Sequence, residues 1–144
     1  MIGLIVTGHG HFGTGLTTSV ELVAGAQENY VAVDFDGQGT EKLENDLRAA
    51  MESLKDCSAI LVLSDLPGGS PMKTSVEVGM GLGLNVRVIA GTNLPMLMAT
   101  CLMRGFMDDV DTLAASVLEE AKNGIMLWQM PTCDDEPADD EEGI

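Results

Sequence analysis

The sequence predicts an α/β fold in which strands and helices alternate along a single domain. Two observations carry this prediction: unbroken apolar runs over residues 2–7 and 59–63, and a helical spacing of apolar residues in the stretches between the runs. A length of 144 residues fits one domain and allows a core that needs no metal or disulfide. The alternation indicates a doubly wound, mainly parallel sheet with helices on both faces.

Short apolar segments with few charges are expected to form the strands: residues 2–7, 30–34, 59–63, 86–90 and 125–130. The first and third are apolar almost throughout, as central parallel strands covered on both faces should be. The second is shorter and is expected nearer an edge. The last is closed by Pro131, and it is also compatible with the end of a helix.

Apolar stripes at helical spacing predict the first three helices: Leu16, Val20 and Val23; Leu43, Leu47, Ala50 and Leu54; Met72, Val76 and Met80. The third helix is expected to open with Ser70 as its N-cap and Pro71 at its first position, and to stop at Gly81 and Gly83.

Two further helices are expected after the fourth strand. One begins near Asn93 and ends at Gly105. The other has acidic residues at 108–111 in its first turn, where the helix dipole favours anions, and it ends at 123–124.

Cysteine usage and segment lengths indicate the compartment. The three cysteines, Cys57, Cys101 and Cys133, have wide spacings that fit neither a disulfide framework nor a zinc site, so reduced thiols are expected. The first residues lack the basic region of a signal peptide, and no apolar stretch reaches the roughly 18 residues of a membrane span. A cytoplasmic protein is therefore expected.

The chain is strongly acidic, with a formal net charge of -16. Seven acidic residues lie within 134–142, which leaves about -9 on residues 1–133. We therefore expect a folded domain over 1–131 and a disordered acidic tail over 132–144. Such a surface disfavours nucleic acid and anionic membranes and favours a basic protein partner, although the acidity is equally explained by solubility.

Two polar stretches follow strands that should be neighbours in the sheet. His9 lies between two glycines just beyond the first strand, and Asp65 lies just beyond the third. In the flavodoxin-like strand order, the ligand site lies at the carboxyl ends of these two strands. A hydrogen bond from His9 Nδ1 to Asp65 would fix the tautomer and leave Nε2 as a nucleophile.

Small residues near this pair are typical of an anion site. Gly68, Gly69 and Ser70 lead into the third helix, whose first amides are unpaired, and Gly10 leaves room beside the imidazole. Together these residues predict phosphoryl transfer onto His9. Taken singly, Asp65 and the Ser70-Pro71 pair are explained equally well by turn and helix capping.

Two other functions can be drawn from the same loop. The segment Gly8-His9-Gly10-His11-Phe12-Gly13 matches a dinucleotide fingerprint, with Asp34 as the ribose-binding acid. The motif alone is weak, and His9 would obstruct the approach of a pyrophosphate. His9 and His11 form a His-x-His pattern after the first strand, which also occurs in metal-dependent hydrolases. Those hydrolases are generally barrels of roughly 250 residues, well above the length of this chain. No metal or other cofactor is expected.

Three ordered segments, LIVTGHG, VLSDLPGGSP and VIAGTNLPML, resemble the IIA domain of the mannose family in the bacterial phosphoenolpyruvate:sugar phosphotransferase system. The similarity spans about residues 1–130. The resemblance implies that His9 is phosphorylated on Nε2 by the carrier protein HPr and passes the group to a IIB protein. It assigns the orienting carboxylate to Asp65, and the phosphoryl contacts to Ser70 and neighbouring amides.

The resemblance also implies four parallel strands plus an antiparallel fifth, exchanged between the subunits of a homodimer. Residues 125–130 are the candidate for that strand, and an ordinary edge strand within one chain is the alternative. Many members have Thr-His-Gly where this chain has Gly8-His9-Gly10, and His11 is expected to be a rim residue. Because the chain ends in an acidic tail rather than a IIB domain, a separate IIB partner is expected. A regulatory phosphohistidine domain that feeds no transporter is the alternative.

Overall fold

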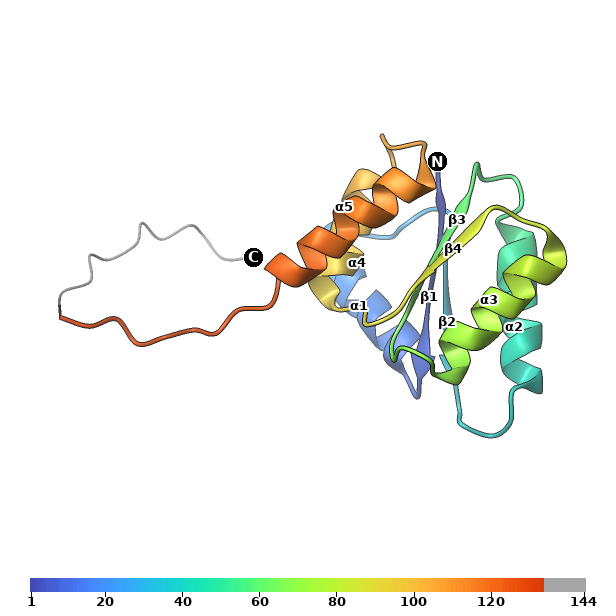
Figure 1. Cartoon of the computed structure of the whole chain (residues 1–144), viewed down its shortest axis with the longest axis horizontal. Coiled ribbons are helices and arrows are strands. Elements are labelled where there is room, and N and C mark those ends of the chain that lie inside the picture. The colour runs from blue at the N-terminus through green and yellow to red at the C-terminus, as the bar shows by residue number, and fades with distance from the viewer. Residues whose placement is uncertain (134–144) are drawn as a thin grey trace.

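The computed structural model describes residues 1–133 (Figure 1). In this range the elements, in chain order, are β1 (Gly3–His9), α1 (Phe12–Ala24), β2 (Tyr30–Phe35), α2 (Glu41–Ser53), β3 (Ile60–Ser64), α3 (Ser70–Leu82), β4 (Val86–Ile89), α4 (Leu94–Met103) and α5 (Val110–Asn123). The first four predicted strands and all five predicted helices are confirmed. Residues 134–144, most of the predicted acidic tail, lie outside the described part of the chain.

The four strands form one parallel sheet in the order β2-β1-β3-β4. This is the order of the flavodoxin-like class, so β1 and β3 lie side by side at the centre. Thr7 is the register partner of Ser64, which brings the carboxyl ends of β1 and β3 to the same edge. β1 runs two residues beyond the predicted strand, so His9 is its last residue and does not lie in a loop.

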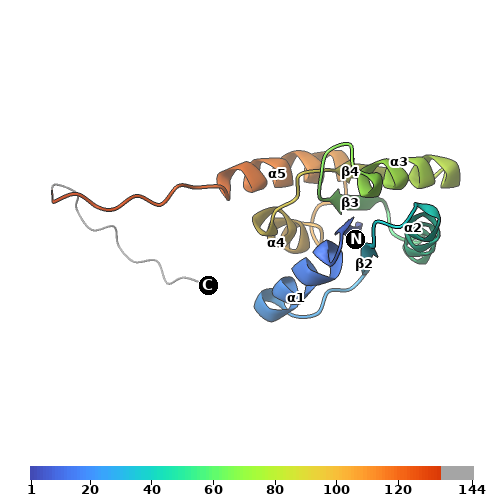
Figure 2. The ribbon, with the colours of Figure 1, turned by 90° about the horizontal axis from the view of Figure 1, so that it is seen from below.

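Helices cover both faces of the sheet (Figure 2). α1, α4 and α5 pack on one face around buried Leu4, Leu61 and Leu97. α2 and α3 pack on the other around buried Ile5 and Val62. Every member of the predicted stripe of α2 is buried: Leu43, Leu47, Ala50 and Leu54. No helix within residues 1–133 is both long and apolar enough to cross a bilayer.

The predicted start and packing face of α3 are wrong. Gly69, not Ser70, is the N-cap residue, and Ser70 is the first helical residue. Val76 and Met80 are exposed, and the helix buries a row of mostly smaller residues instead: Pro71, Thr74, Ser75, Val78 and Gly79. A Cβ on Gly79 would lie 3.1 Å from Val86 Cβ, so the glycine lets α3 approach β4 closely. This close packing turns the apolar stripe outward.

The predicted strand over residues 125–130 does not form in the single chain. After α5 the described backbone leaves the domain in an irregular, extended path (Figure 1). Its large apolar side chains are exposed by 67 to 80%: Ile125, Met126, Leu127, Trp128 and Met130. A strand needs a neighbouring edge with which to pair, and neither edge strand of this sheet, β2 or β4, is paired with the segment.

Candidate functional site

His9 and Asp65 meet at the carboxyl edge of the sheet. Asp65 directly follows β3, and its Oδ2 lies 2.7 Å from His9 Nδ1. The same oxygen accepts a hydrogen bond from the backbone N–H of His9 at 2.8 Å. The strand order thus brings together two residues that are 56 positions apart.

The carboxyl group of Asp65 is held in its ionised form. Burial alone would raise its pKa, but hydrogen bonds from the backbone and ring of His9 and from the Leu66 amide more than offset this, and the pKa is lowered. A carboxylate only accepts hydrogen bonds, so His9 Nδ1 carries the proton in this pair. In this tautomer the lone pair of the ring lies on Nε2.

The imidazole is fixed on one side and open on the other. Phe35, the register partner of His9 on β2, makes an edge-on contact with the imidazole at a centroid distance of 5.4 Å. The His9 side chain keeps 43% of its surface exposed. No protein atom within residues 1–133 hydrogen-bonds to Nε2, so this nitrogen is available to a ligand.

The two glycines beside His9 have different causes. A Cβ on Gly8 would lie 2.5 Å from the ring of Phe12, so Gly8 makes room for this side chain and not for a ligand. Gly10 has φ +59, which favours glycine, and its surroundings are open. Its N–H donates to Phe35 O at 2.7 Å and is therefore already paired.

The turn that precedes α3 lies against the imidazole. A Cβ on Gly69 would lie 3.2 Å from His9 Cε1, which shows how closely this backbone approaches the ring. The Gly69 amide donates to Leu66 O at 3.0 Å, and the Gly68 amide to the Met72 sulfur at 3.2 Å. The predicted phosphoryl contacts are Gly10, Gly68, Gly69 and Ser70. Among the described residues only Ser70 of these four has an unpaired N–H, and its hydroxyl is unpaired as well.

His11 belongs to a second imidazole–carboxylate pair. Its Nδ1 lies 3.2 Å from Asp34 Oδ2, and its side chain is 93% exposed. Asp34 also accepts hydrogen bonds from the amide and hydroxyl of Thr14, at 3.0 and 2.6 Å. The acid proposed for a ribose is thus bound to the first turn of α1, and Gly13 packs against the Val6 carbonyl.

His9 and His11 hold different carboxylates rather than converging on one point. Within residues 1–133 there is no group of three or more His, Cys, Asp or Glu side chains that could hold a metal ion. Sequence reasoning missed the contact of Phe35 with His9, although its position at the end of the strand next to β1 was a usable signal. It also missed the His11–Asp34 pair as a structural contact.

Fold and site together define a flavodoxin-like domain with a carboxylate-oriented imidazole at its switch point. A family model described as the PTS system fructose IIA component, EIIA-man, matches residues 3–118.

Relatives and a solved structure agree with this match. The fructose-specific EIIA component of Bacillus subtilis is 30% identical over 105 residues, which cover 72% of this chain and 71% of that protein. The mannose-specific EIIAB component of Escherichia coli K12 is 30% identical over 125 residues, or 86% of this chain but only 38% of that longer protein. A crystal structure of a phosphotransferase system EIIA component from Streptococcus agalactiae has a TM-score of 0.76 and 36% identity, covering 88% of this chain and 96% of that one.

The chain belongs to the mannose/fructose/sorbose family of IIA components of the phosphotransferase system. The resemblance seen in its three sequence motifs is confirmed. The chain spans less than half the length of the E. coli protein.

Proposed function

We propose that this protein is a phosphocarrier that accepts a phosphoryl group from phospho-HPr on His9 Nε2 and passes it to a IIB protein during sugar uptake. Membership of the IIA family supports the class of reaction. The observation that carries the assignment to His9 is the 2.7 Å contact between its Nδ1 and the Asp65 carboxylate. This contact leaves Nε2 as the nucleophilic nitrogen.

The transfer needs no proton to enter or leave His9. The lone pair of Nε2 attacks phosphorus while the bond from phosphorus to the donor's imidazole nitrogen breaks, and that nitrogen keeps the bonding electron pair. The Nδ1 proton stays between His9 and Asp65. The phosphorylated ring gains positive charge, which the Asp65 carboxylate in contact with Nδ1 balances. Transfer to the IIB protein is the same step in reverse.

Ser70 is the best-placed ligand for the phosphoryl oxygens. Its N–H and hydroxyl are unpaired among the described residues, and it begins α3, where the helix dipole favours an anion. Gly69 brings this turn against His9 without a side chain in between. Gly10 and Gly68 contribute open space, with no atom within 4 Å of an added Cβ.

We also propose that two copies exchange residues 125–130 as a fifth strand. β4 is an edge strand, and a groove of about 360 Å³ runs between it and the exposed side of α3. Apolar side chains from both elements line this groove, among them Val76, Met80, Val86 and Val88. The exposed side chains of residues 125–130 supply a matching apolar segment.

The phosphocarrier proposal is tested by incubation with labelled phosphoenolpyruvate and the general carrier proteins. Wild type should acquire an acid-labile, base-stable label, His9→Ala should acquire none, and His11→Ala should be labelled like wild type. His11→Ala is the matched control because it removes the other carboxylate-bound imidazole. A label that survives His9→Ala and disappears in His11→Ala would overturn the assignment.

A further inference from the structure

Phosphorylation of His9 places a strong negative charge in an acidic protein. A phosphoryl group carries about -1.5 to -2 at neutral pH. The chain has a formal net charge of -16, and the carboxylates of Asp34 and Asp65 lie at the same edge of the sheet as His9. The amides that begin α3 supply only partial positive charge. A full cation beside the phosphoryl group would therefore matter more here than in a neutral protein.

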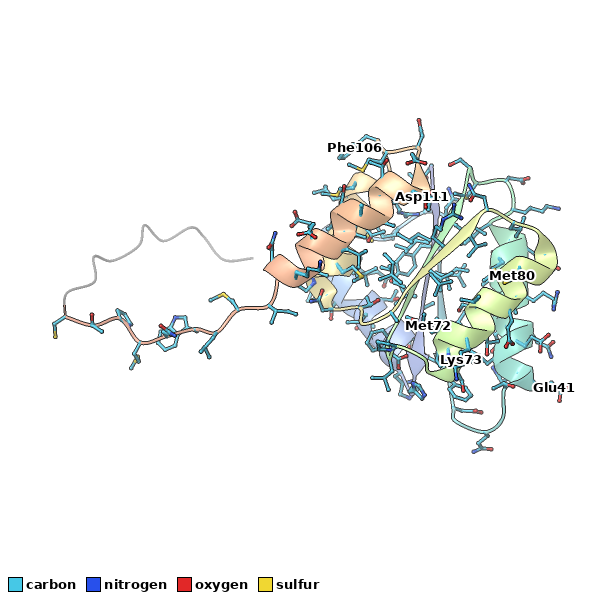
Figure 3. All side chains as sticks on the ribbon, in the orientation of Figure 1. Glu41, Met72, Lys73, Met80, Phe106 and Asp111 are labelled. Atoms are coloured by element: carbon cyan, nitrogen blue, oxygen red, sulfur yellow. The ribbon has the colours of Figure 1, made fainter. Side chains whose placement is uncertain are left out.

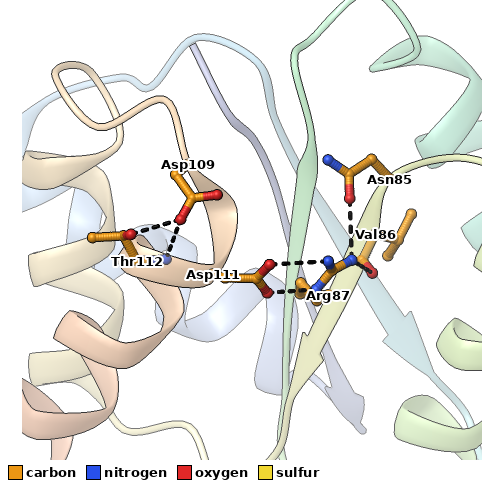
Figure 4. Close-up of polar contacts among 6 residues, drawn as sticks. All are labelled: Asn85, Val86, Arg87, Asp109, Asp111 and Thr112. Atoms are coloured by element: carbon orange, nitrogen blue, oxygen red, sulfur yellow. Dashed lines mark hydrogen bonds and ion pairs between the residues drawn. The ribbon is translucent and has the colours of Figure 1, made fainter.

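Most basic side chains of the protein already have partners. Of the 7 Lys and Arg residues, four form ion pairs: Lys42 with Asp46, Arg48 with Glu44, Arg87 with Asp111, and Lys122 with Glu119. Figure 4 shows the two-pronged contact of Arg87 with Asp111, which joins β4 to α5. Arg104 is buried on backbone carbonyls. Among the basic residues described, only Lys55 and Lys73 have an ammonium group without an ion pair or hydrogen bond.

These two lysines lie near opposite ends of the parallel strands. Lys55 follows α2 near the amino edge, where its neighbour Cys57 approaches Gly3 at the start of β1. Lys73 lies in the first turn of α3, at the carboxyl end of the sheet strands (Figure 3), and His9 is the last residue of β1. Lys73 is thus the free lysine on the side of the proposed phosphoryl site.

The backbone links Lys73 to the imidazole through a single residue. Its N–H donates to Gly69 O at 3.0 Å, so Lys73 stands one helical turn beyond Gly69 on the same face. Gly69 in turn lies against His9, with 3.2 Å between its added Cβ and His9 Cε1. Side chains on a helix lean toward its N-terminus, so the flexible stem of Lys73 can carry the ammonium group back over this turn.

This position is unfavourable for a lysine unless an anion is present. The first turn of a helix repels cations, and Lys73 has no hydrogen bond to Glu77 one turn further on. Local preferences of this kind are broken most often where function requires it. Resting on the phosphocarrier function above, we propose that the Lys73 ammonium group binds a non-bridging oxygen of the phosphoryl group as it is transferred to His9.

The test uses a small phosphoryl donor, potassium phosphoramidate, so that docking of a carrier protein plays no part. The rate of phosphorylation of His9 is compared among wild type, Lys73→Gln, Lys73→Arg and the matched control Lys55→Gln. Lys73→Gln should react about three- to tenfold more slowly, as expected for loss of one charge at a solvent-exposed site. Lys73→Arg should recover most of the rate, and Lys55→Gln should match wild type.

A second measurement separates a contact with the phosphoryl group from a change in structure. The pH titration of the phosphohistidine ³¹P signal should move to higher pH in Lys73→Gln, because loss of the ammonium group makes the phosphoryl group less acidic. Equal rates and titrations for Lys73→Gln and Lys55→Gln would overturn the proposal. So would a defect seen only with the protein donor and removed by raising its concentration, since that indicates docking. If wild type itself is not phosphorylated on His9, the phosphocarrier function fails first.

Discussion

One oxygen of Asp65 holds both the backbone and the ring of His9: Oδ2 lies 2.8 Å from the backbone nitrogen and 2.7 Å from Nδ1. The contact to the backbone fixes where β1 ends, and the contact to the ring fixes which nitrogen carries the proton. The orientation and the tautomer of the proposed nucleophile therefore depend on the same carboxylate.

Asp65→Asn should slow phosphorylation of His9 by roughly 10- to 100-fold while the protein stays folded. An amide oxygen at this position can still accept one hydrogen bond, but the charge that stabilises the phosphorylated ring is lost. The measurement is the initial rate of labelling from phospho-HPr, with circular dichroism as a check on folding.

Asp34→Asn is the matched control for this substitution, because Asp34 holds the other imidazole in a similar contact. We expect its labelling rate to stay within about twofold of wild type, since the proposed transfer uses His9 and not His11. An unchanged rate in Asp65→Asn would remove Asp65 from the mechanism. Equal losses in both variants would show that general acidity at this edge matters, rather than the orientation of His9.

Stability should fall in acid because folding makes Asp34 a stronger acid. Burial would raise its pKa, but hydrogen bonds from the hydroxyl and amide of Thr14 and from His11 lower it overall. A group whose pKa is lowered by folding stabilises the protein above its unfolded pKa of about 3.9, and this contribution is lost as the pH falls toward the folded pKa. The free energy of unfolding should thus decline below about pH 4.

The check is urea unfolding of wild type and Asp34→Asn at about pH 5 and pH 3. The variant should lose less stability between the two pH values than wild type, because it has no proton to bind at this position. An equal loss in the two proteins would show that the acid sensitivity comes from other carboxyl groups, of which Asp65 is the first to examine.

The central strands were predictable because their unbroken apolar composition is typical of strands buried between two layers of helices. Residues of β1 and β3 are buried on both faces, and only such burial favours unbroken apolar runs. The position of His9 beside Asp65 followed from the strand order. The face of α3 was not predictable from periodicity, because the helix approaches the sheet through Gly79 and leaves Met80 outside. Small buried residues give no apolar signal.

Details of the site depended on hydrogen bonds that a sequence does not display. Gly10 and Gly69 were predicted to belong to an anion site, but the N–H of each is paired with a backbone carbonyl. Gly8 also flanks His9, but it makes space for the side chain of Phe12. The segment 125–130 carries a strand pattern, but pairing requires an edge that its own chain does not place beside it. In each case the sequence indicates the chemical type of the residue but not the group with which it pairs or packs.

The proposed exchange of residues 125–130 makes the oligomeric state sensitive to the groove beside β4. Met80→Asp places a charge where the fifth strand should pack, so it should weaken a dimer by about tenfold or more. Met80 is 79% exposed in the single chain, so folding of each copy should be unaffected. Leu22→Asp on α1, at an 87% exposed position, is the control. Sedimentation equilibrium measures both.

Two results would contradict the exchanged strand. One is a wild-type chain that stays monomeric at all concentrations tested. The other is a dimer that tolerates Met80→Asp and is lost in Leu22→Asp, which would place the interface on α1. As a further check, Trp128 is 67% exposed in the single chain, so its fluorescence should shift to shorter wavelength on dimerisation.

Arg104, at the end of α4, joins this helix to the amino ends of the sheet. Its side chain is 2% exposed, and its guanidinium donates to the carbonyls of Ile2 at 3.1 Å and Asn29 at 2.9 Å, and to that of Glu28. The Asn29 carbonyl also accepts the Leu4 amide. None of the ion pairs within residues 1–133 involves Arg104, so its direct hydrogen-bond partners are backbone carbonyls.

Arg104→Met should therefore lower the free energy of unfolding by roughly 2–4 kcal/mol, because it removes the donor to the buried Ile2 carbonyl and to the part-buried carbonyls of Glu28 and Asn29. Arg104→Lys should recover only part of this loss, since a single ammonium group cannot reach all three carbonyls at once. Urea unfolding measures both variants against Arg48→Met, which removes an exposed pair with Glu44 and should cost less than about 0.5 kcal/mol. If Arg104→Met proved as stable as Arg48→Met, the hydrogen bonds of the Arg104 guanidinium would contribute nothing measurable to stability. The amino ends of β1 and β2 would then be held by their ladder alone.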